Sequence, residues 1–446
     1  MKERNDMDLL NDSIKKLYWK FLVPSIGGAM VVSLYNFVDT IAIGQGVGPN
    51  GTAACAVFLP LFWIAEFIGL LCGIGGSVLM SEARGSGDHE KGNAYFTAAL
   101  IFCALLTGIA WIASILWKEP LFRFFGADDV IMPYALKYGS LIAAALPFFV
   151  MATFLSCFVR NDGAPSLTMV AVCLGAVSTM TLDYILVFPM NMGMLGAACA
   201  TTSGSVIQVI IMGSYFFSKK CSLRLVKPAR LLNCFREIIV NGFGSGFSIL
   251  AVMVLTFIAN NQIMTYSDAD SLAVYGMICT LSTLFLSIYT GVGQACQPIA
   301  SSNFGANLKE RYMGVRRMGL ITCMILGVVF SGLCLLIPEQ LTMLFMQVTP
   351  GVMEVAPFIL RVYGISFLPL AFTAFLSIYL QSVMRPVAAT VISVCRGLAV
   401  SGVLLYILPA IMGGDGIWYA FTVAEFLVAA AALVYMVRTD KAVIAK

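Results

Sequence analysis

The feature that most constrains this chain is a succession of apolar stretches, each about 20 residues long, that runs almost the whole length of the sequence. A helix of that length crosses the roughly 30 Å hydrocarbon core of a bilayer. Soluble domains carry about 25% charged residues, whereas this 446-residue chain has 11% charged and 60% hydrophobic residues. The sequence therefore predicts an all-α integral membrane protein.

Apolar runs separated by polar segments predict twelve membrane-spanning helices. The first six lie near residues 17–43, 52–80, 93–116, 136–159, 165–188 and 195–217. The second six lie near residues 236–265, 271–298, 315–337, 357–384, 388–411 and 416–437. An even number of spans places both termini on the same side of the membrane.

The distribution of Lys and Arg orients these spans. If the N-terminus lies in the cytoplasm, all but four of the 27 basic residues fall in inner segments or at inner helix ends, the exceptions being Lys118, Arg123, Lys137 and Arg361. Cytoplasmic segments of membrane proteins are enriched in Lys and Arg. We therefore expect a multi-pass protein of the cell membrane with both termini in the cytoplasm. The net charge of +4 then needs no nucleic-acid partner.

The two sets of six helices resemble each other. Twenty-two residues separate Tyr138 from Arg160, and the same interval separates Tyr363 from Arg385. GMLGAACA matches GGDGIWYA, and SEARGSGDHEK matches SSNFGANLKER, both at an offset of 220 residues. Because each half has an even number of spans, both halves insert in the same direction. We expect two six-helix bundles related by a pseudo-two-fold axis along the membrane normal.

This duplication divides the chain into five segments. They are a cytoplasmic N-terminal segment (1–16), an N-lobe with helices 1 to 6 (17–217), a cytoplasmic linker (218–235), a C-lobe with helices 7 to 12 (236–437) and a cytoplasmic tail (438–446). The N-terminal segment lacks the pattern of a signal peptide. It is interpreted as an amphipathic helix on the inner leaflet or as an inward extension of the first span.

Composition argues against an enzyme. The thirteen cysteines are scattered without a CxxC pair and are typical of small buried apolar residues. His89 is the only histidine and lies in a polar loop, and neither a GxSxG elbow nor an HExxH motif is present. We expect no catalytic residues and no cofactor.

Four acidic residues fall inside predicted spans, where a charge costs at least about 2.5 kcal/mol; they are Asp39, Glu66, Asp183 and Glu425. Asp39 and Asp183 each lie about one turn before the outer end of a helix that runs outward, so they share a depth. Four polar residues are predicted near the same level: Tyr35, Asn36, Thr179 and Thr201. The sequence predicts a polar cluster in the first half.

Two carboxylates in a low-dielectric pocket resist being ionised together, which favours proton exchange. The same oxygens are hard ligands that suit a small cation such as Na⁺, and we expect no other metal. The sequence leaves H⁺ and Na⁺ open. A purely structural role, with the carboxyl groups hydrogen-bonded between helices, is the alternative.

Three further residues are singled out by position. Glu66 lies near the middle of the second span and Glu425 about two turns into the twelfth, so either lines a substrate cavity or pairs as a protonated carboxyl with a neighbouring helix. Pro24 lies in the first span, where it either bends the helix or marks its start.

These residues resemble the multidrug and toxic compound extrusion (MATE) family over nearly the whole chain. The resemblance rests on Pro24 followed by VDTIAIG, on SEARGSGD, RNDGAP, LDYIL and LGAACATT, and in the second half on QPIASSNFGA and LQSVMR. It implies two six-helix lobes that alternate between outward-open and inward-open states and expel cationic or amphipathic compounds in exchange for H⁺ or Na⁺.

The resemblance also implies roles for single residues. Asp39 and Asp183 look like the acidic pair of the family's N-lobe, with Thr201 as its hydroxyl partner, Tyr35 in its network and Pro24 as its bend. Thr179 departs from the asparagine that some members carry. The interiors of the seventh and tenth spans hold no acid, so the DinF-like side of the family is the better match.

We therefore expect a monomeric antiporter that exports small cationic or amphipathic molecules. A flippase for a lipid-linked precursor is the alternative, although its cavity should be strongly basic, whereas the deep charges here are mostly acidic. An ion channel is disfavoured because the sequence has no TVGYG-like filter.

Overall fold

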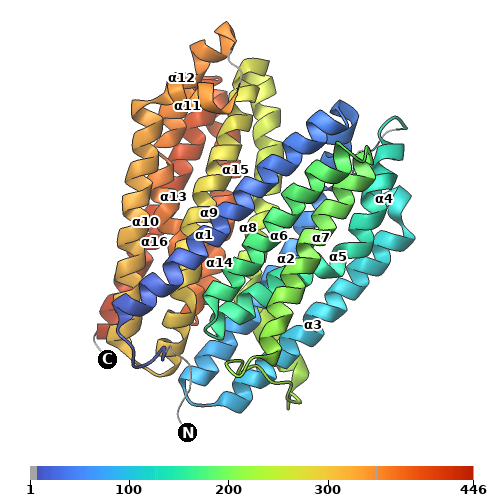
Figure 1. The fold of residues 1–446 in the computed structure, drawn as a ribbon. Coiled ribbons are helices and arrows are strands. Elements are labelled where there is room, and N and C mark those ends of the chain that lie inside the picture. The colour runs from blue at the N-terminus through green and yellow to red at the C-terminus, as the bar shows by residue number, and fades with distance from the viewer. Residues whose placement is uncertain (1–7, 126, 128, 347–348, 445–446) are drawn as a thin grey trace. The chain divides into compact units, whose positions relative to one another are not determined.

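A computed structural model describes residues 8–125, 127, 129–346 and 349–444, without the side chains of residues 34, 36–38, 40, 41, 44, 49, 50, 52, 53, 56 and 441–444. The regular structure of these residues is entirely helical (Figure 1). Ten of the helical segments are long and apolar enough to cross a membrane, and a bent pair raises this number to eleven. The predicted all-helical class is therefore confirmed.

The helices of the first half are α1 (Ile14–Gly46), α2 (Pro49–Gly85), α3 (His89–Leu116), α4 (Lys118–Phe124), α5 (Met132–Asn161), α6 (Pro165–Val187) and α7 (Gly193–Gly213), followed by the 3₁₀ turn η1 (Ser214–Phe217). Those of the second half are α8 (Leu231–Tyr266), α9 (Ala269–Gly305), α10 (Lys309–Leu336), α11 (Pro338–Phe345), α12 (Pro350–Gly364), α13 (Phe367–Ser382), α14 (Pro386–Val394), η2 (Cys395–Ala399), α15 (Val400–Met412) and α16 (Asp415–Ile444). Each of the twelve predicted spans coincides with one helix or with a broken helix.

Two predicted spans are interrupted. The tenth consists of α12 and α13, which meet at an angle of 42°. Pro369 explains this bend because it supplies no N–H group and its ring collides with the carbonyl four residues earlier, in the break. The eleventh span contains η2, a π-helical turn between α14 and α15.

Structural details repeat at the same offset as the sequence. The short helices α4 and α11, which are not among the predicted spans, begin at Lys118 and Pro338, 220 residues apart. Positive φ angles also recur at this offset, at Gly193 (55°) and Gly413 (71°). Left-handed backbone of this kind favours glycine, which has no Cβ to collide with the chain. These recurrences agree with the predicted duplication.

Contacts divide the chain into two compact units. One comprises residues up to Gly246 together with Gln297–Tyr312, and the other comprises Phe247–Cys296 together with Met313 onward. The start of α8 and the end of α9 therefore belong to the same unit as α1 to α7.

In the first unit, helices pack in pairs through small residues. Helix α1 packs mainly on α6, and α6 lies beside α7 (Figure 1). Helix α2 approaches α8 so closely that a Cβ on Gly242 would collide with the carbonyl oxygen of Leu71, and a Cβ on Gly75 would collide with that of Ile238. In the second unit, α16 packs against α12, α13, α15 and η2.

Candidate functional site

The predicted acidic pair comes together inside the first unit. Asp39 lies on α1 and Asp183 on α6, and the packing of α1 on α6 places each carboxyl group in the electrostatic field of the other. Asp183 is 1% exposed. Neither of its carboxyl oxygens has a hydrogen-bond donor among the side chains that the structure describes. Because ionised carboxylates only accept hydrogen bonds and repel each other, a proton or a cation bound here would stabilise the two groups.

Thr201 joins this pair from a third helix. Its hydroxyl on α7 lies 3.4 Å from Oδ1 of Asp39, and it also donates to the carbonyl of Ala197 at 3.0 Å. Close packing of α6 on α7 fixes this position, since a Cβ on Gly204 would collide with the hydroxyl of Thr179. Oxygen atoms from three helices therefore converge on one point.

The other three residues predicted for the polar cluster are Tyr35, Thr179 and Asn36. Tyr35 is one turn from Asp39 on α1 and lies in the electrostatic field of both Asp39 and Glu66. The Thr179 hydroxyl donates to the carbonyl of Gly175 at 3.1 Å and packs on α7, so it serves the contact between α6 and α7. The side chain of Asn36 lies outside the described residues.

Two residues near the pair were not predicted as site residues. Tyr138 on α5 is 2% exposed, and its hydroxyl lies near Thr201. Cys55 on α2 lies beside Tyr138. In the sequence, Tyr138 stands out only by its match with Tyr363 in the other half. That repeat was a usable signal, because the hydroxyl of Tyr363 also makes a polar contact, 3.5 Å from Ser282 Oγ.

The two other intramembrane acids each pair with a threonine. The Thr153 hydroxyl on α5 donates to Glu66 on α2 at 3.0 Å. In the second unit, the Thr373 hydroxyl on α13 lies 3.5 Å from Glu425 on α16. Glu66 belongs to the unit that holds the acidic pair, whereas Glu425 does not.

Pro24 lies inside α1, which begins ten residues earlier at Ile14. The interpretation that a helix starts at Pro24 is therefore wrong. A proline in this position removes one backbone donor from the helix. Whether α1 bends there during a functional cycle stays a prediction.

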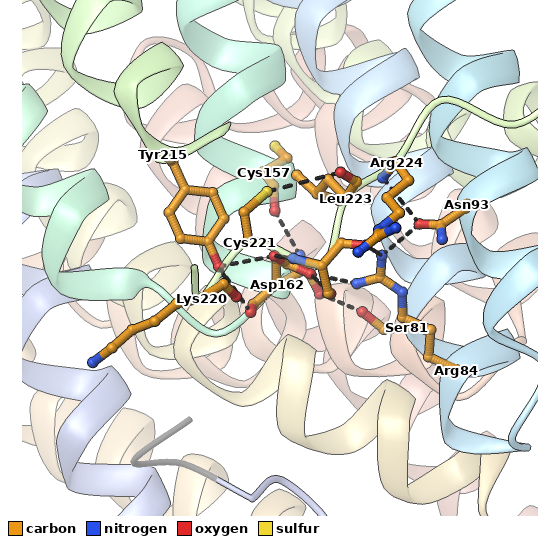
Figure 2. A network of polar contacts seen from close by, with 12 residues as sticks. Ser81, Arg84, Asn93, Cys157, Asp162, Tyr215, Lys220, Cys221, Leu223 and Arg224 are labelled. Carbon is orange, nitrogen blue, oxygen red and sulfur yellow. Dashed lines mark hydrogen bonds and ion pairs between the residues drawn. The ribbon is translucent and has the colours of Figure 1, made fainter. Parts of the chain in front are cut away.

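A second polar network surrounds Asp162 at the end of α5 (Figure 2). The Asp162 carboxylate, whose side chain is fully buried, pairs with Arg84 from the end of α2. It also accepts from the Tyr215 hydroxyl at 2.8 Å and from the backbone N–H of Ser222 at 2.9 Å. Asn93 joins by accepting from Arg84 at 2.8 Å.

This network attaches the start of the predicted linker to the first unit. Arg84 donates to the carbonyl of Ser222 at 3.1 Å, and Asn93 accepts from the N–H of Arg224 at 3.3 Å. Further along, the Thr97 hydroxyl accepts from the N–H of Val226 at 3.0 Å. The segment from Ser222 to Val226 is therefore fixed by side chains of α2, α3 and α5.

The acidic pair and Thr201 offer oxygen ligands from three side chains. No group of three His, Cys, Asp or Glu side chains is placed to hold a metal ion within the part of the chain that the structure describes. The oxygens of Asp39, Asp183 and Thr201 can instead hold one proton or one small cation. Long apolar helices with a buried acidic pair define a multi-pass membrane transporter.

The chain belongs to the MatE family, whose model matches residues 24–185 and 245–407. The multidrug export protein MepA of Staphylococcus saprophyticus is 25% identical over 436 residues, which cover 96% of this chain and 94% of that protein. MepA of Staphylococcus aureus is 24% identical over 430 residues, 95% of this chain and 94% of its own length. The predicted family is therefore confirmed, while the DinF-like assignment stays a prediction.

Solved structures have the same fold. An outward-facing multidrug resistance MATE family transporter of the MOP superfamily superposes with a TM-score of 0.91 at 21% identity and covers 99% of both chains. A MOP superfamily transporter from Pyrococcus furiosus, described as having a binding pocket of reverse polarity, gives 0.91 at 20% identity over all of both chains. The predicted twelve helices in two bundles are confirmed by this likeness.

Proposed function

We propose that this protein is a secondary active antiporter that exports cationic or amphipathic small molecules in exchange for H⁺ or Na⁺. The observation that carries the proposal is the proximity of Asp39 and Asp183, which the packing of α1 on α6 creates inside the first unit. Its relatives in two Staphylococcus species are named multidrug export proteins. These names favour export over the flippase alternative.

The acidic pair is suited to coupling because two negative charges at this site would have a high electrostatic free energy. Ionised carboxylates in a medium of low dielectric repel each other and lose their hydration. Binding of one H⁺ or Na⁺ relieves this repulsion, and Thr201 supplies a further oxygen. Release of the cation restores the repulsion, which then favours a conformation that solvates the pair.

Alternating access turns this binding energy into transport. A ligand shifts a conformational equilibrium only by its differential affinity for the two states. We infer that the cation is held more tightly in the outward-open state and lost in the inward-open state. The lobes at 17–217 and 236–437, with the linker 218–235 between them, are the bodies we expect to move.

The remaining roles follow from charge. Glu66 and Glu425 are candidates for attracting a cationic substrate, since both hold a carboxyl group at the depth of the membrane interior. The clustering of Lys and Arg in alternate segments supports cytoplasmic termini. We expect the monomer to be the transporting unit.

The experiment that tests the proposal uses purified protein in liposomes and rhodamine 123, an aromatic cation. H⁺ and Na⁺ gradients are imposed separately, and dye flux is measured for each. We expect one gradient to accelerate flux in the direction opposite to the ion. Flux that neither gradient changes would remove the antiport proposal, whereas a response to only one identifies the coupling ion.

A further inference from the structure

The second unit contains a membrane-buried arginine in an unusual backbone setting. Arg396 lies in the π-helical turn η2, near the middle of the segment formed by α14, η2 and α15. The turn is stabilised locally, since the Ser401 hydroxyl donates to the carbonyl of Arg396 at 2.7 Å. Single π-helical turns within α-helices occur frequently at functional sites.

The guanidinium group of Arg396 is incompletely satisfied. Its Nη1 atom is buried and has no hydrogen-bond partner among the residues that the structure describes. Arg396 lies ten residues, about 15 Å, from the start of its segment and sixteen residues, about 24 Å, from its end. An unpaired charged donor at this depth is costly.

Glu425 supplies an opposite charge beside this arginine. Helix α16 packs on η2, and Glu425 lies in the electrostatic field of Arg396. It occupies the same face of α16 as the buried Phe421, Val428 and Ala432, away from the exposed Leu427. The hydroxyl of Thr373, which is fully buried on α13, lies 3.2 Å from the carbonyl oxygens of Pro369 and Leu370 and 3.5 Å from the carboxyl group of Glu425. Three elements therefore place polar groups of both signs in the interior of one unit.

One donor of the Arg396 guanidinium group is not satisfied by these neighbours. Glu425 offsets the charge of Arg396, but the Nη1 donor still has no acceptor among the described residues. A carboxylate would supply that acceptor, because guanidinium binds carboxylate with strong, charge-assisted hydrogen bonds. Glu425 would then be free to face a cationic group on the same molecule.

We propose that Arg396 forms, with Glu425 and Thr373, a binding site for the carboxylate group of an amphipathic zwitterionic solute. This proposal rests on the export function proposed above and names a substrate class for it. Arg396 binds the carboxylate, Glu425 faces the cationic part, and Thr373 holds Glu425 in place. The site lies entirely within the second unit, whereas the acidic pair belongs to the first unit.

Two dyes with one aromatic scaffold test the site. Rhodamine 110 carries a free carboxylate, and rhodamine 123 is its methyl ester, so they differ in the anionic group alone. Binding to purified protein is measured by fluorescence polarisation without any gradient. We expect Arg396→Gln to weaken rhodamine 110 binding roughly tenfold to a hundredfold and to leave rhodamine 123 binding unchanged.

Two further variants separate recognition from a structural ion pair. Arg385→Gln is the matched control, because Arg385 in the same unit donates to Thr439 at 2.9 Å near a helix end. We expect it to bind both dyes normally. The double variant Arg396→Gln/Glu425→Gln removes both charges, and we expect it to remain defective for rhodamine 110.

Four outcomes would overturn the site. They are no rhodamine 110 binding by the wild type, equal loss of both dyes in Arg396→Gln, unchanged binding of both dyes in that variant, and recovery of rhodamine 110 binding in the double variant. Wild-type protein that binds rhodamine 110 through Arg396 but transports neither dye under a gradient would contradict only the export function.

Discussion

The Asp162 carboxylate at the end of α5 accepts hydrogen bonds from both the backbone N–H and the hydroxyl of Ser222, sixty residues further along the chain. Asp162 thereby fixes the position of the segment that follows η1. The buried Asp162 side chain therefore holds this basic connecting segment in place, and the protection of the segment from proteolysis can be measured.

Replacing Asp162 should release this connecting segment. Asp162→Ala leaves Arg84 without its carboxylate partner, and breaking a buried ion pair costs about 3–5 kcal/mol. We expect a lower melting temperature in detergent and faster tryptic cleavage at Lys219, Lys220, Arg224, Lys227 and Arg230. Asp129→Ala is the control, because Asp129 pairs with Arg123 at the surface with 87% of its side chain exposed. Equal cleavage rates in the two variants would contradict the claim that Asp162 holds this segment in place.

The close approach of α2 to α8 should not tolerate a methyl group. Gly242→Ala places a Cβ against the carbonyl of Leu71, and overpacking of this kind costs about 1–3 kcal/mol. We expect a lower melting temperature for this variant. Gly108→Ala is the matched control, since a Cβ there meets no atom within 4 Å. If the two variants melt alike, the contact is not tight.

Tyr138 should tune the acidic pair through Thr201. Tyr138→Phe removes the hydroxyl near Thr201 but keeps the buried ring. A polar interaction of this kind is worth about 1 kcal/mol, so we expect its loss to weaken the apparent affinity for the coupling cation roughly fivefold. The measurement is the ion-concentration dependence of dye flux, with Tyr134→Phe on the same helix as control. An unchanged dependence would exclude Tyr138 from the site.

The start of α9 should depend on pH. Asp268 accepts from the N–H of Ser271 at 2.8 Å, and hydrogen bonding to Ser271 lowers the pKa of this carboxyl group below its usual 3.8. The ionised form is thus favoured in the folded state, so its stabilisation is present above about pH 4 and is lost as the pH falls through the folded pKa.

Two substitutions test this N-cap. Asp268→Ala should lower the melting temperature at pH 7, where an N-cap is worth about 1 kcal/mol, and the difference from wild type should shrink towards pH 3. Asp268→Asn keeps a capping oxygen that does not titrate, so it should stay near wild type at pH 7. A difference for Asp268→Ala that is constant with pH would contradict the assignment.

Much of the fold was predictable because bilayer thickness imposes a length on apolar helices. The same length criterion passed over α4 and α11, which have 7 and 8 residues. It also gave no sign of the break between α12 and α13 or of the π-helical η2. These depend on a proline and on local backbone geometry, which a window of mean hydropathy averages away.

The site was predictable where counting along helices sufficed. Equal distances from helix ends placed Asp39, Asp183 and Thr201 together, and the structure brings them together. Spacing could not choose among rotamers, so Thr179 was expected beside the acids although its hydroxyl bonds to its own helix. Tyr138 was missed because it lies on α5, a helix that carries no acidic residue to mark its position relative to the pair.

The central claim is that Asp39 and Asp183 couple a cation to export. Its most direct test is rhodamine 123 flux in liposomes under the gradient that drives the wild type, for Asp39→Asn, Asp183→Asn and the surface control Asp129→Asn. Neutral amides hold neither a proton nor a second charge, so we expect each of the first two variants to lose gradient-driven flux at least about tenfold while Asp129→Asn retains it. Near-normal gradient-driven flux in both Asp39→Asn and Asp183→Asn would contradict the account.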